Sequence, residues 1–81
     1  MKILITGIGG TVGSVIADAL SKQHEVTGID IRPLERDGTV VADLTDINTI
    51  SPLFEGVDAV IHLAGADIAG YILLRLPLEI K

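Results

Sequence analysis

The spacing of apolar positions changes several times along the chain, and each change predicts a new element. Residues Lys2 to Thr6 (KILIT) are a short, continuous apolar run that ends at a glycine, which is typical of a buried strand. From Thr11 the apolar residues recur every three or four positions, which predicts an amphipathic helix. The apolar face of this helix is expected to consist of Val12, Val15, Ile16, Ala19 and Leu20.

Three further apolar runs follow, and each predicts a strand. They are residues 25–30 (EVTGID), 39–42 (TVVA) and 58–64 (DAVIHLA). A short helical segment, capped by Thr45 or Asp46, is expected between the last two. Because apolar strands alternate with helices, the pattern favours an α/β fold with a parallel sheet.

The link between the second and third strands is short, at about eight residues, 31–38. Parallel neighbours usually need a dozen or more residues, often including a helix. Eight extended residues still reach about 26 Å, which is enough to pass back along a strand of about 17 Å. We therefore expect a loop crossover here.

The last residues have a different pattern. Apolar and polar residues alternate strictly from Leu74 to Ile80, which predicts a half-buried strand. Pro77 lies on the polar face and favours an edge position. The alternative is a helix that starts at Ala66 and ends before Pro77. The expected division of the chain is residues 1–66 as one unit and residues 67–81 as a tail.

Composition narrows the class of protein. The chain has 81 residues, enough for one domain or part of one, and 48% of them are hydrophobic although only Phe54 and Tyr71 are aromatic. Aliphatic residues of this kind are typical of buried parallel strands.

The net charge of −5 disfavours a nucleic-acid or anionic-membrane partner. The chain has no cysteine, and its two histidines are far apart, so we expect no disulfide and no metal centre. No apolar run approaches the length of about 18 residues that a membrane span needs, so a soluble, cytoplasmic protein is expected.

Three glycines are spaced three apart where the first strand meets the helix. In a dinucleotide site, a glycine at the position of Gly7 permits the tight turn, one at Gly10 lets the backbone approach the pyrophosphate, and one at Gly13 lets the helix pack closely. The backbone N–H groups of Thr11 and Val12, at the positive end of the helix, would then face the phosphates. The alternative is that these glycines only form a turn in a small domain.

An acidic residue stands where such a site requires one. Asp30 ends the second strand, 20 residues after Gly10, and a carboxylate there accepts hydrogen bonds from the ribose hydroxyls of the adenosine. Its charge would repel a 2′-phosphate, which favours NAD over NADP. Arg32 leaves NADP as the alternative cofactor, because a guanidinium at this position can bind that phosphate. The alternative for Asp30 is an ordinary residue at the end of a strand.

Four motifs in order, TGIGGTVG, GID, ADLTD and VDAVIHLAG, resemble the extended short-chain dehydrogenase/reductase family, of the NAD-dependent epimerase/dehydratase type. This family acts on nucleotide sugars and similar substrates. The resemblance covers residues 1 to about 66. It implies the first half of a Rossmann sheet, with strand order 3-2-1-4 and flanking helices, which holds the adenosine end of the cofactor.

The resemblance also implies roles for later residues. Asp43 and Leu44 would lie against the adenine, with the Asp43 carboxylate meeting the exocyclic amine. Leu63, Ala64 and Gly65 would pass beneath the adenine-side ribose and the phosphates, where small residues let the backbone approach.

No catalytic residue is assigned in this chain. The resemblance implies a catalytic Ser or Thr and a Tyr-x-x-x-Lys pair, which in the family lie well beyond residue 81. Tyr71 and Arg75 have a similar spacing, but they stand too early, and arginine does not replace lysine as a compact, tunable cation. We expect His62 to be a packed strand side chain rather than an acid or base, and His24 to be a solvated turn residue.

These observations lead to a functional hypothesis and an alternative. The chain is expected to be the NAD-binding portion of an epimerase/dehydratase-like protein without its catalytic half, either a truncated product or a part completed by a separate chain. The alternative is a non-enzymatic structural or interaction module that keeps only the fold. The outer edge of the fourth strand would be bare, which invites pairing. We expect the tail to cover this edge as an extra strand, or to pair with a second chain in a homodimer.

Overall fold

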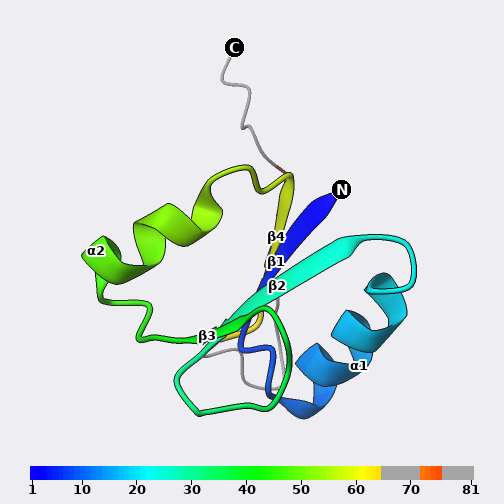
Figure 1. Ribbon diagram of the computed structural model, residues 1–81, viewed down its shortest axis with the longest axis horizontal. Helices are drawn as coiled ribbons and strands as arrows, with labels where there is room; N and C mark the ends of the chain where they lie inside the picture. Colours follow the sequence, from blue (N-terminus) through cyan, green and yellow to red (C-terminus); the bar gives the residue numbers. More distant parts are fainter. Residues whose placement is uncertain (65–71, 76–81) are drawn as a thin grey trace.

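The computed structural model describes residues 1–64 and 72–75, which form one sheet with a helix on each face (Figure 1). The elements in chain order are β1 (Lys2–Thr6), α1 (Thr11–Leu20), β2 (Glu25–Asp30), β3 (Thr39–Val41), α2 (Ile47–Ile50), the 3₁₀ helix η1 (Ser51–Phe54), β4 (Ala59–His62) and β5 (Ile72–Arg75). The bounds of β1 and β2 and the start of α1 agree with the predictions. The strands β3 and β4 are shorter than the apolar runs that predicted them.

The sheet has the strand order β3-β2-β1-β4-β5. The first four strands are parallel, so the predicted order 3-2-1-4 is confirmed. The link over residues 31–38 contains no helix, and β3 lies parallel to β2 with Gly28 opposite Thr39. The loop crossover is therefore confirmed as well.

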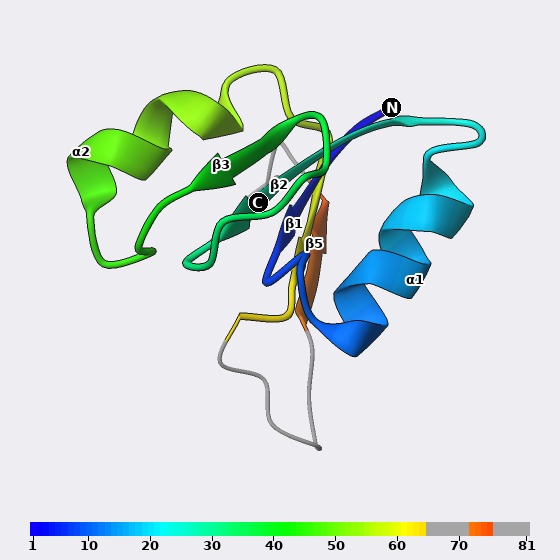
Figure 2. The same ribbon diagram turned by 60° about the horizontal axis from the view of Figure 1, so that its bottom comes forward.

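The strand β5 lies antiparallel to β4, with Ala59 opposite Arg75 and His62 opposite Ile72 (Figure 2). Over these four residues the tail is therefore a strand and not the alternative helix. It occupies the outer edge of β4 that the first four strands leave bare. The later positions of the alternating pattern, Leu76, Leu78 and Ile80, lie outside the described residues.

The helix α1 packs on the face of the sheet that carries Ile3 and Ile5. Its predicted apolar face is wrong in part, because Val12 and Val15 are 51% and 64% exposed whereas Gly13 and Ala17 are buried. The reason is close packing: a Cβ at Gly13 would lie 2.5 Å from the carbonyl oxygen of Gly7. The smallest residues of the helix lie closest to the rest of the protein. The buried face of α1 is therefore rotated away from the face that carries Val12 and Val15.

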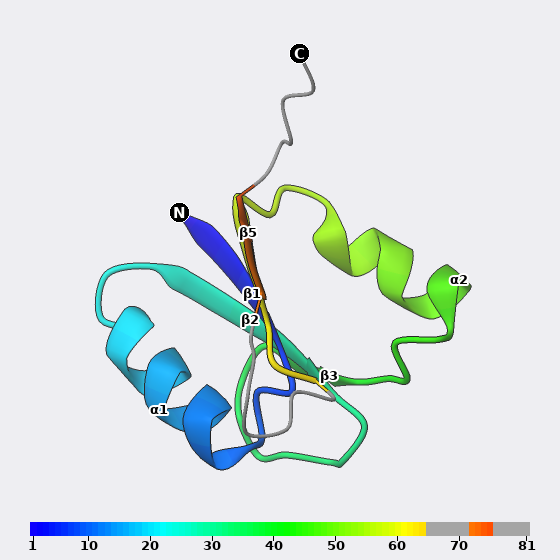
Figure 3. The same ribbon diagram turned by 180° about the vertical axis from the view of Figure 1, so that it is seen from behind.

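The helices α2 and η1 cover the opposite face (Figures 1 and 3). Ile50 packs there with Leu4, Ile29 and Val60 in a second core cluster. Of the two residues predicted to cap α2, the cap is Asp46, whose side chain accepts from the amide of Thr49. None of the helices in the described part of the chain has the length and apolar character needed to cross a bilayer.

Candidate functional site

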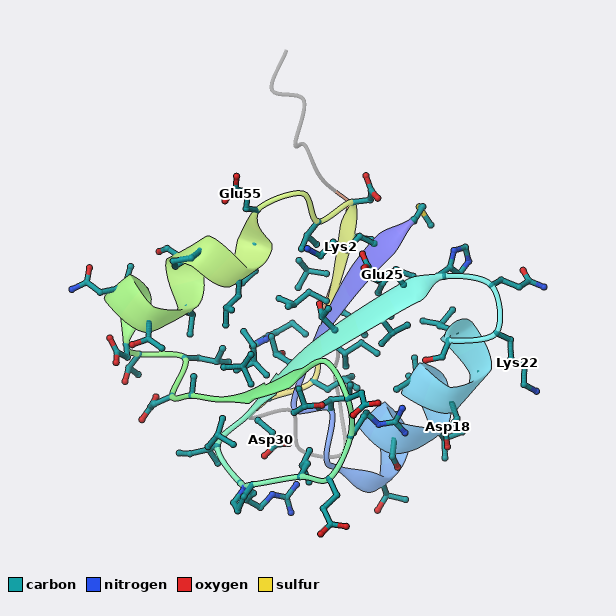
Figure 4. The ribbon with its side chains drawn as sticks, in the orientation of Figure 1. Lys2, Asp18, Lys22, Glu25, Asp30 and Glu55 are labelled. Carbon is teal, nitrogen blue, oxygen red and sulfur yellow. The ribbon has the colours of Figure 1, made fainter. Side chains whose placement is uncertain are left out.

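A cleft of about 660 Å³ opens at the carboxyl ends of the four parallel strands. Four segments line it, one at the carboxyl end of each strand: Gly7 with Gly10, residues 29–32, residues 42–44 and residues 62–64. In Figure 4, Asp30 lies at the opposite end of the sheet from Lys2 and Glu25, which begin β1 and β2. Ligands of open α/β sheets bind at this carboxyl edge.

Most of the residues predicted from the sequence lie together in this cleft. Eight of the twelve line it: Gly7, Gly10, Asp30, Arg32, Asp43, Leu44, Leu63 and Ala64. Thr11, Val12 and Gly13 form the start of α1 rather than the lining. Gly65 lies outside the described residues.

The cleft also contains four residues that the sequence did not indicate as binding residues, namely Ile29, Ile31, Ala42 and His62. Each is the immediate chain neighbour of a predicted residue. Assigning whole segments at strand ends, rather than single motif positions, would have included them. His62 is half-buried at the end of β4, and its ring bonds to Thr6, so it is a packed strand side chain that also faces the cleft.

The three spaced glycines have three different physical causes. Gly7 has a φ of +72°, and a Cβ there would lie 2.8 Å from the amide nitrogen of Ala64. Gly13 brings α1 against the turn, as described above. A Cβ at Gly10, in contrast, would meet no atom of residues 1–64 or 72–75 closer than 3.5 Å. The fold itself therefore leaves the space beside Gly10 open, and this glycine lines the cleft.

The start of α1 offers free backbone donors beside this opening. Gly10 is the N-cap and provides no side-chain cap. Among the described residues, no acceptor bonds to the amides of Thr11, Val12 or Gly13. Unpaired amides at the positive end of a helix attract anions, and phosphates in particular.

Asp30 links the end of β2 to the glycine turn. Its Oδ2 accepts from the Gly9 amide at 2.8 Å, and its Oδ1 accepts from the amide and Nε of Arg32 at 2.9 and 3.3 Å. Burial alone would raise the pKa of Asp30, which is only 5% exposed, but the hydrogen bonds from Arg32 and Gly9 lower the pKa below its ordinary value of 3.8. The carboxylate is therefore charged near neutral pH, although it is buried.

Asp43 provides a second carboxylate at the end of β3. Its Oδ1 accepts from the amide and hydroxyl of Thr45, at 2.9 and 2.8 Å. These two bonds lower the pKa of Asp43 below its ordinary value. Its Oδ2 has no hydrogen-bond partner in residues 1–64, so this atom is available to a donor in the cleft.

The matching family model covers residues 3–72 and is that of the NAD dependent epimerase/dehydratase family. The chain belongs to this family. The resemblance on which the sequence-based expectations depend is therefore confirmed, and the cleft lies within the matched residues.

Relatives of similar sequence include two dehydrogenases. An L-arabinose 1-dehydrogenase (NAD(P)(+)) from Haloferax volcanii is 41% identical over 63 residues, which are 78% of this chain and 25% of that protein. A uronate dehydrogenase from Pseudomonas putida is 34% identical over 72 residues, covering 82% of this chain and 27% of that protein. The chain thus spans about a quarter of the length of these relatives.

Solved structures share the fold. A short-chain dehydrogenase/reductase superfamily protein from Agrobacterium tumefaciens, crystallised with bound NAD, superposes with a TM-score of 0.72 at 41% identity, over 85% of this chain and 21% of that one. Uronate dehydrogenase from the same organism superposes with a TM-score of 0.69 at 31% identity, over 76% of this chain and 25% of that one. The Rossmann-like arrangement of this family is therefore the fold of this chain.

Proposed function

We propose that this chain binds the adenosine and pyrophosphate portion of NAD in the cleft at the carboxyl edge of the sheet. One observation carries the proposal: the cleft contains an open glycine position and two charged carboxylates, and the unpaired amides at the start of α1 follow directly after Gly10, which lines it. Such donors suit a pyrophosphate, and such acceptors suit ribose hydroxyls and an amine. The related Agrobacterium structure with bound NAD supports the same assignment.

In this proposal, each part of the cleft takes one part of the cofactor. The amides of Thr11 and Val12 bind the pyrophosphate, which approaches over Gly10. Asp30 accepts from the adenosine ribose, and Asp43 accepts from the exocyclic amine of the adenine. A carboxylate can accept about four hydrogen bonds, and three positions on Asp30 are already used, so Oδ2 retains one for a ribose hydroxyl.

The remaining predicted residues complete the proposed contacts. Leu44 lies beside Asp43 and supplies apolar surface for the adenine. Leu63 and Ala64, which face Gly7, pass beneath the ribose and the phosphates.

The proposed preference is for NAD over NADP. The Asp30 carboxylate lies in the cleft and would repel a 2′-phosphate. Arg32 is the feature that favours NADP, because its side chain is 62% exposed and only its Nε is bound to Asp30. A guanidinium that is free on its outer side can still bind a phosphate, so weaker binding of NADP is expected.

The proposed role of the cofactor site is in a dehydrogenase for sugars or sugar acids. The support for it comes from the two named classes of relatives, which are L-arabinose and uronate dehydrogenases. We propose that this chain provides the adenosine side of the cofactor site and no catalytic residue. A cytoplasmic location is part of the same proposal.

We further propose that the chain uses its own β5 at the outer edge of β4. In the homodimer expected as the alternative, the tail would pair with a second chain, whereas β5 pairs with β4 of its own chain. Light scattering at high protein concentration tests this, because a clean monomer is expected and would count against the homodimer.

Calorimetric titration of the 81-residue chain with NAD and with NADP tests the cofactor site. We expect NAD to bind more tightly than NADP, and Asp30→Ala to weaken NAD binding by about tenfold, as for the loss of a charged hydrogen-bond partner. Asp37→Ala is the matched control, because it removes the same charge from an exposed position outside the cleft. Absence of binding at millimolar NAD would reject the proposal and favour the non-enzymatic alternative.

A further inference from the structure

The Thr6 side chain, at the end of β1, holds the segment that follows β4. Thr6 is buried, with 2% of its surface exposed. Its Oγ1 accepts from the amides of Leu63 and Ala64 at 3.1 and 3.3 Å, and it lies 2.6 Å from Nδ1 of His62. The Leu63 amide also donates to the carbonyl oxygen of Thr6 at 3.0 Å. One hydroxyl therefore joins three consecutive residues of β4 and its following turn to β1.

The hydrogen-bonding capacity of the hydroxyl determines the state of His62. A threonine hydroxyl has two lone pairs and one proton. The amides of Leu63 and Ala64 occupy both lone pairs, so the proton of Thr6 must go to Nδ1 of His62. Nδ1 is then an acceptor, and the neutral imidazole carries its own proton on Nε2.

The residues held in this way form one wall of the cleft. Leu63 and Ala64 line it, and they lie against the first glycine of the turn. A Cβ at Gly7 would lie 2.8 Å from the Ala64 amide nitrogen and 3.0 Å from the Leu63 carbonyl carbon. Since Thr6 directly precedes Gly7, its hydroxyl sets the spacing between the glycine turn and the segment after β4.

We propose that Thr6 and His62 are positioning residues of the cofactor cleft. His62, held as the Nε2–H tautomer, orients the Thr6 hydroxyl so that both of its lone pairs bind the amides of Leu63 and Ala64. Neither side chain needs to contact the cofactor for this role. The effect on the cofactor rests on the proposed NAD site, whereas the tautomer and the hydrogen bonds are properties of the protein alone.

Nitrogen NMR of the full chain tests the arrangement directly, because His24 is the only other histidine. We expect the neutral His62 ring to be the Nε2–H tautomer. In Thr6→Val, which keeps the shape but loses the hydroxyl, we expect a mixture of tautomers and shifted amide signals for Leu63 and Ala64. Thr27→Val is the matched control, because Thr27 also lies on a central strand and its hydroxyl makes, within the described residues, only a bond of 3.5 Å to the Ile3 carbonyl.

Calorimetry with NAD on the same variants tests the positioning role. Thr6→Val is expected to raise the Kd for NAD by about tenfold, the size expected when a buried hydrogen-bond partner is lost. Two conservative variants should remain close to the wild type: Thr6→Ser, which keeps the hydroxyl, and His62→Asn, whose amide oxygen replaces Nδ1 as acceptor. His62→Leu, which offers no acceptor, should behave like Thr6→Val.

Two results would overturn the inference. One is an Nδ1–H tautomer of His62 in the wild type, and the other is NAD binding by Thr6→Val equal to that of Thr27→Val. Failure of the wild type to bind millimolar NAD would instead reject the proposed function, and the NMR signals of Leu63, Ala64 and His62 would still decide whether the hydrogen bonds exist as described.

Discussion

The backbone amide of Gly9 donates a hydrogen bond of 2.8 Å to Oδ2 of Asp30, which lies 21 residues later in the chain. A Cβ at position 9 would lie 2.8 Å from the same oxygen and 2.7 Å from Cδ1 of Leu34, so a larger residue here would require these side chains to shift. The bond ties the glycine turn to the end of β2. Asp30 therefore has two roles in the proposed site: it is an acceptor for the ribose, and it holds the turn that leads to the phosphate-binding amides.

Replacing Asp30 by asparagine should affect stability as well as binding. The Asp30→Asn side chain keeps the shape but loses the charge, and its NH₂ group would face an N–H donor. We expect the free energy of unfolding to fall by about 1–3 kcal/mol, as for a disrupted buried hydrogen bond. Urea denaturation of the wild type, of this variant and of the exposed control Asp37→Asn measures the difference. A variant as stable as the control would contradict the structural role of Asp30.

The lowered pKa of Asp30 predicts how stability depends on pH. A carboxyl whose pKa is lower in the folded than in the unfolded protein contributes stability above its ordinary pKa of 3.8, and that stability is lost as the pH falls through the folded value. The wild type should therefore lose stability below about pH 4, and its advantage over Asp30→Asn should shrink there. Asp43 acts in the same direction, but solvent screens this exposed group. Urea denaturation over a pH series checks this, and a constant difference between the two proteins would contradict it.

Alanine substitutions at Gly10 and Gly13 should have different effects: the first should weaken NAD binding, and the second should lower the free energy of unfolding. The methyl group of Gly10→Ala would make no close contact with the described part of the chain, and the φ of −73° is one that any residue adopts. The free energy of unfolding should therefore change by less than about 1 kcal/mol. The added methyl group lies where the pyrophosphate is proposed to approach, so the Kd for NAD should rise by about tenfold or more.

Gly13→Ala is the counterpart. Its methyl group would lie 2.5 Å from the Gly7 carbonyl oxygen, and overpacking of this kind costs about 1–3 kcal/mol of stability. Thermal unfolding and calorimetry on both variants make the comparison. Equal effects of the two substitutions on unfolding would show that the space beside Gly10 is not open.

Asp43 and Asp46 provide a second contrast between neighbours of equal charge. Asp43→Ala removes the proposed partner of the adenine amine and should raise the Kd for NAD by about threefold to tenfold. Asp46→Ala removes the cap of α2, which accepts from the amide and hydroxyl of Thr49, and should cost about 0.5–2 kcal/mol of stability. Calorimetry and urea denaturation on both variants measure the two effects. Weaker NAD binding by Asp46→Ala than by Asp43→Ala would reverse the assignment.

Much of the fold was predictable because it depends on local patterns. The apolar run of β1 and the periodicity that begins at Thr11 determine their own backbone conformation, and the structure begins and ends β1 and begins α1 at the predicted residues. The strand order followed from the family resemblance. The buried face of α1 was not predictable in this way. Apolar periodicity assigns large side chains such as Val15 to the buried face, whereas the close packing of the helix against the sheet buries Gly13 and Ala17.

The same distinction between local pattern and tertiary packing applies to the candidate site. By itself, the sequence determined the glycine spacing, the acids at the ends of β2 and β3, and hence the edge of the sheet where a cofactor would bind. Only the tertiary structure decided which atoms meet there: Gly9 with Asp30, and Thr6 with His62 and the two residues that follow it. The physical reason is that periodicity and spacing report on the local backbone. A hydrogen bond between distant residues depends instead on where parallel strands place their ends.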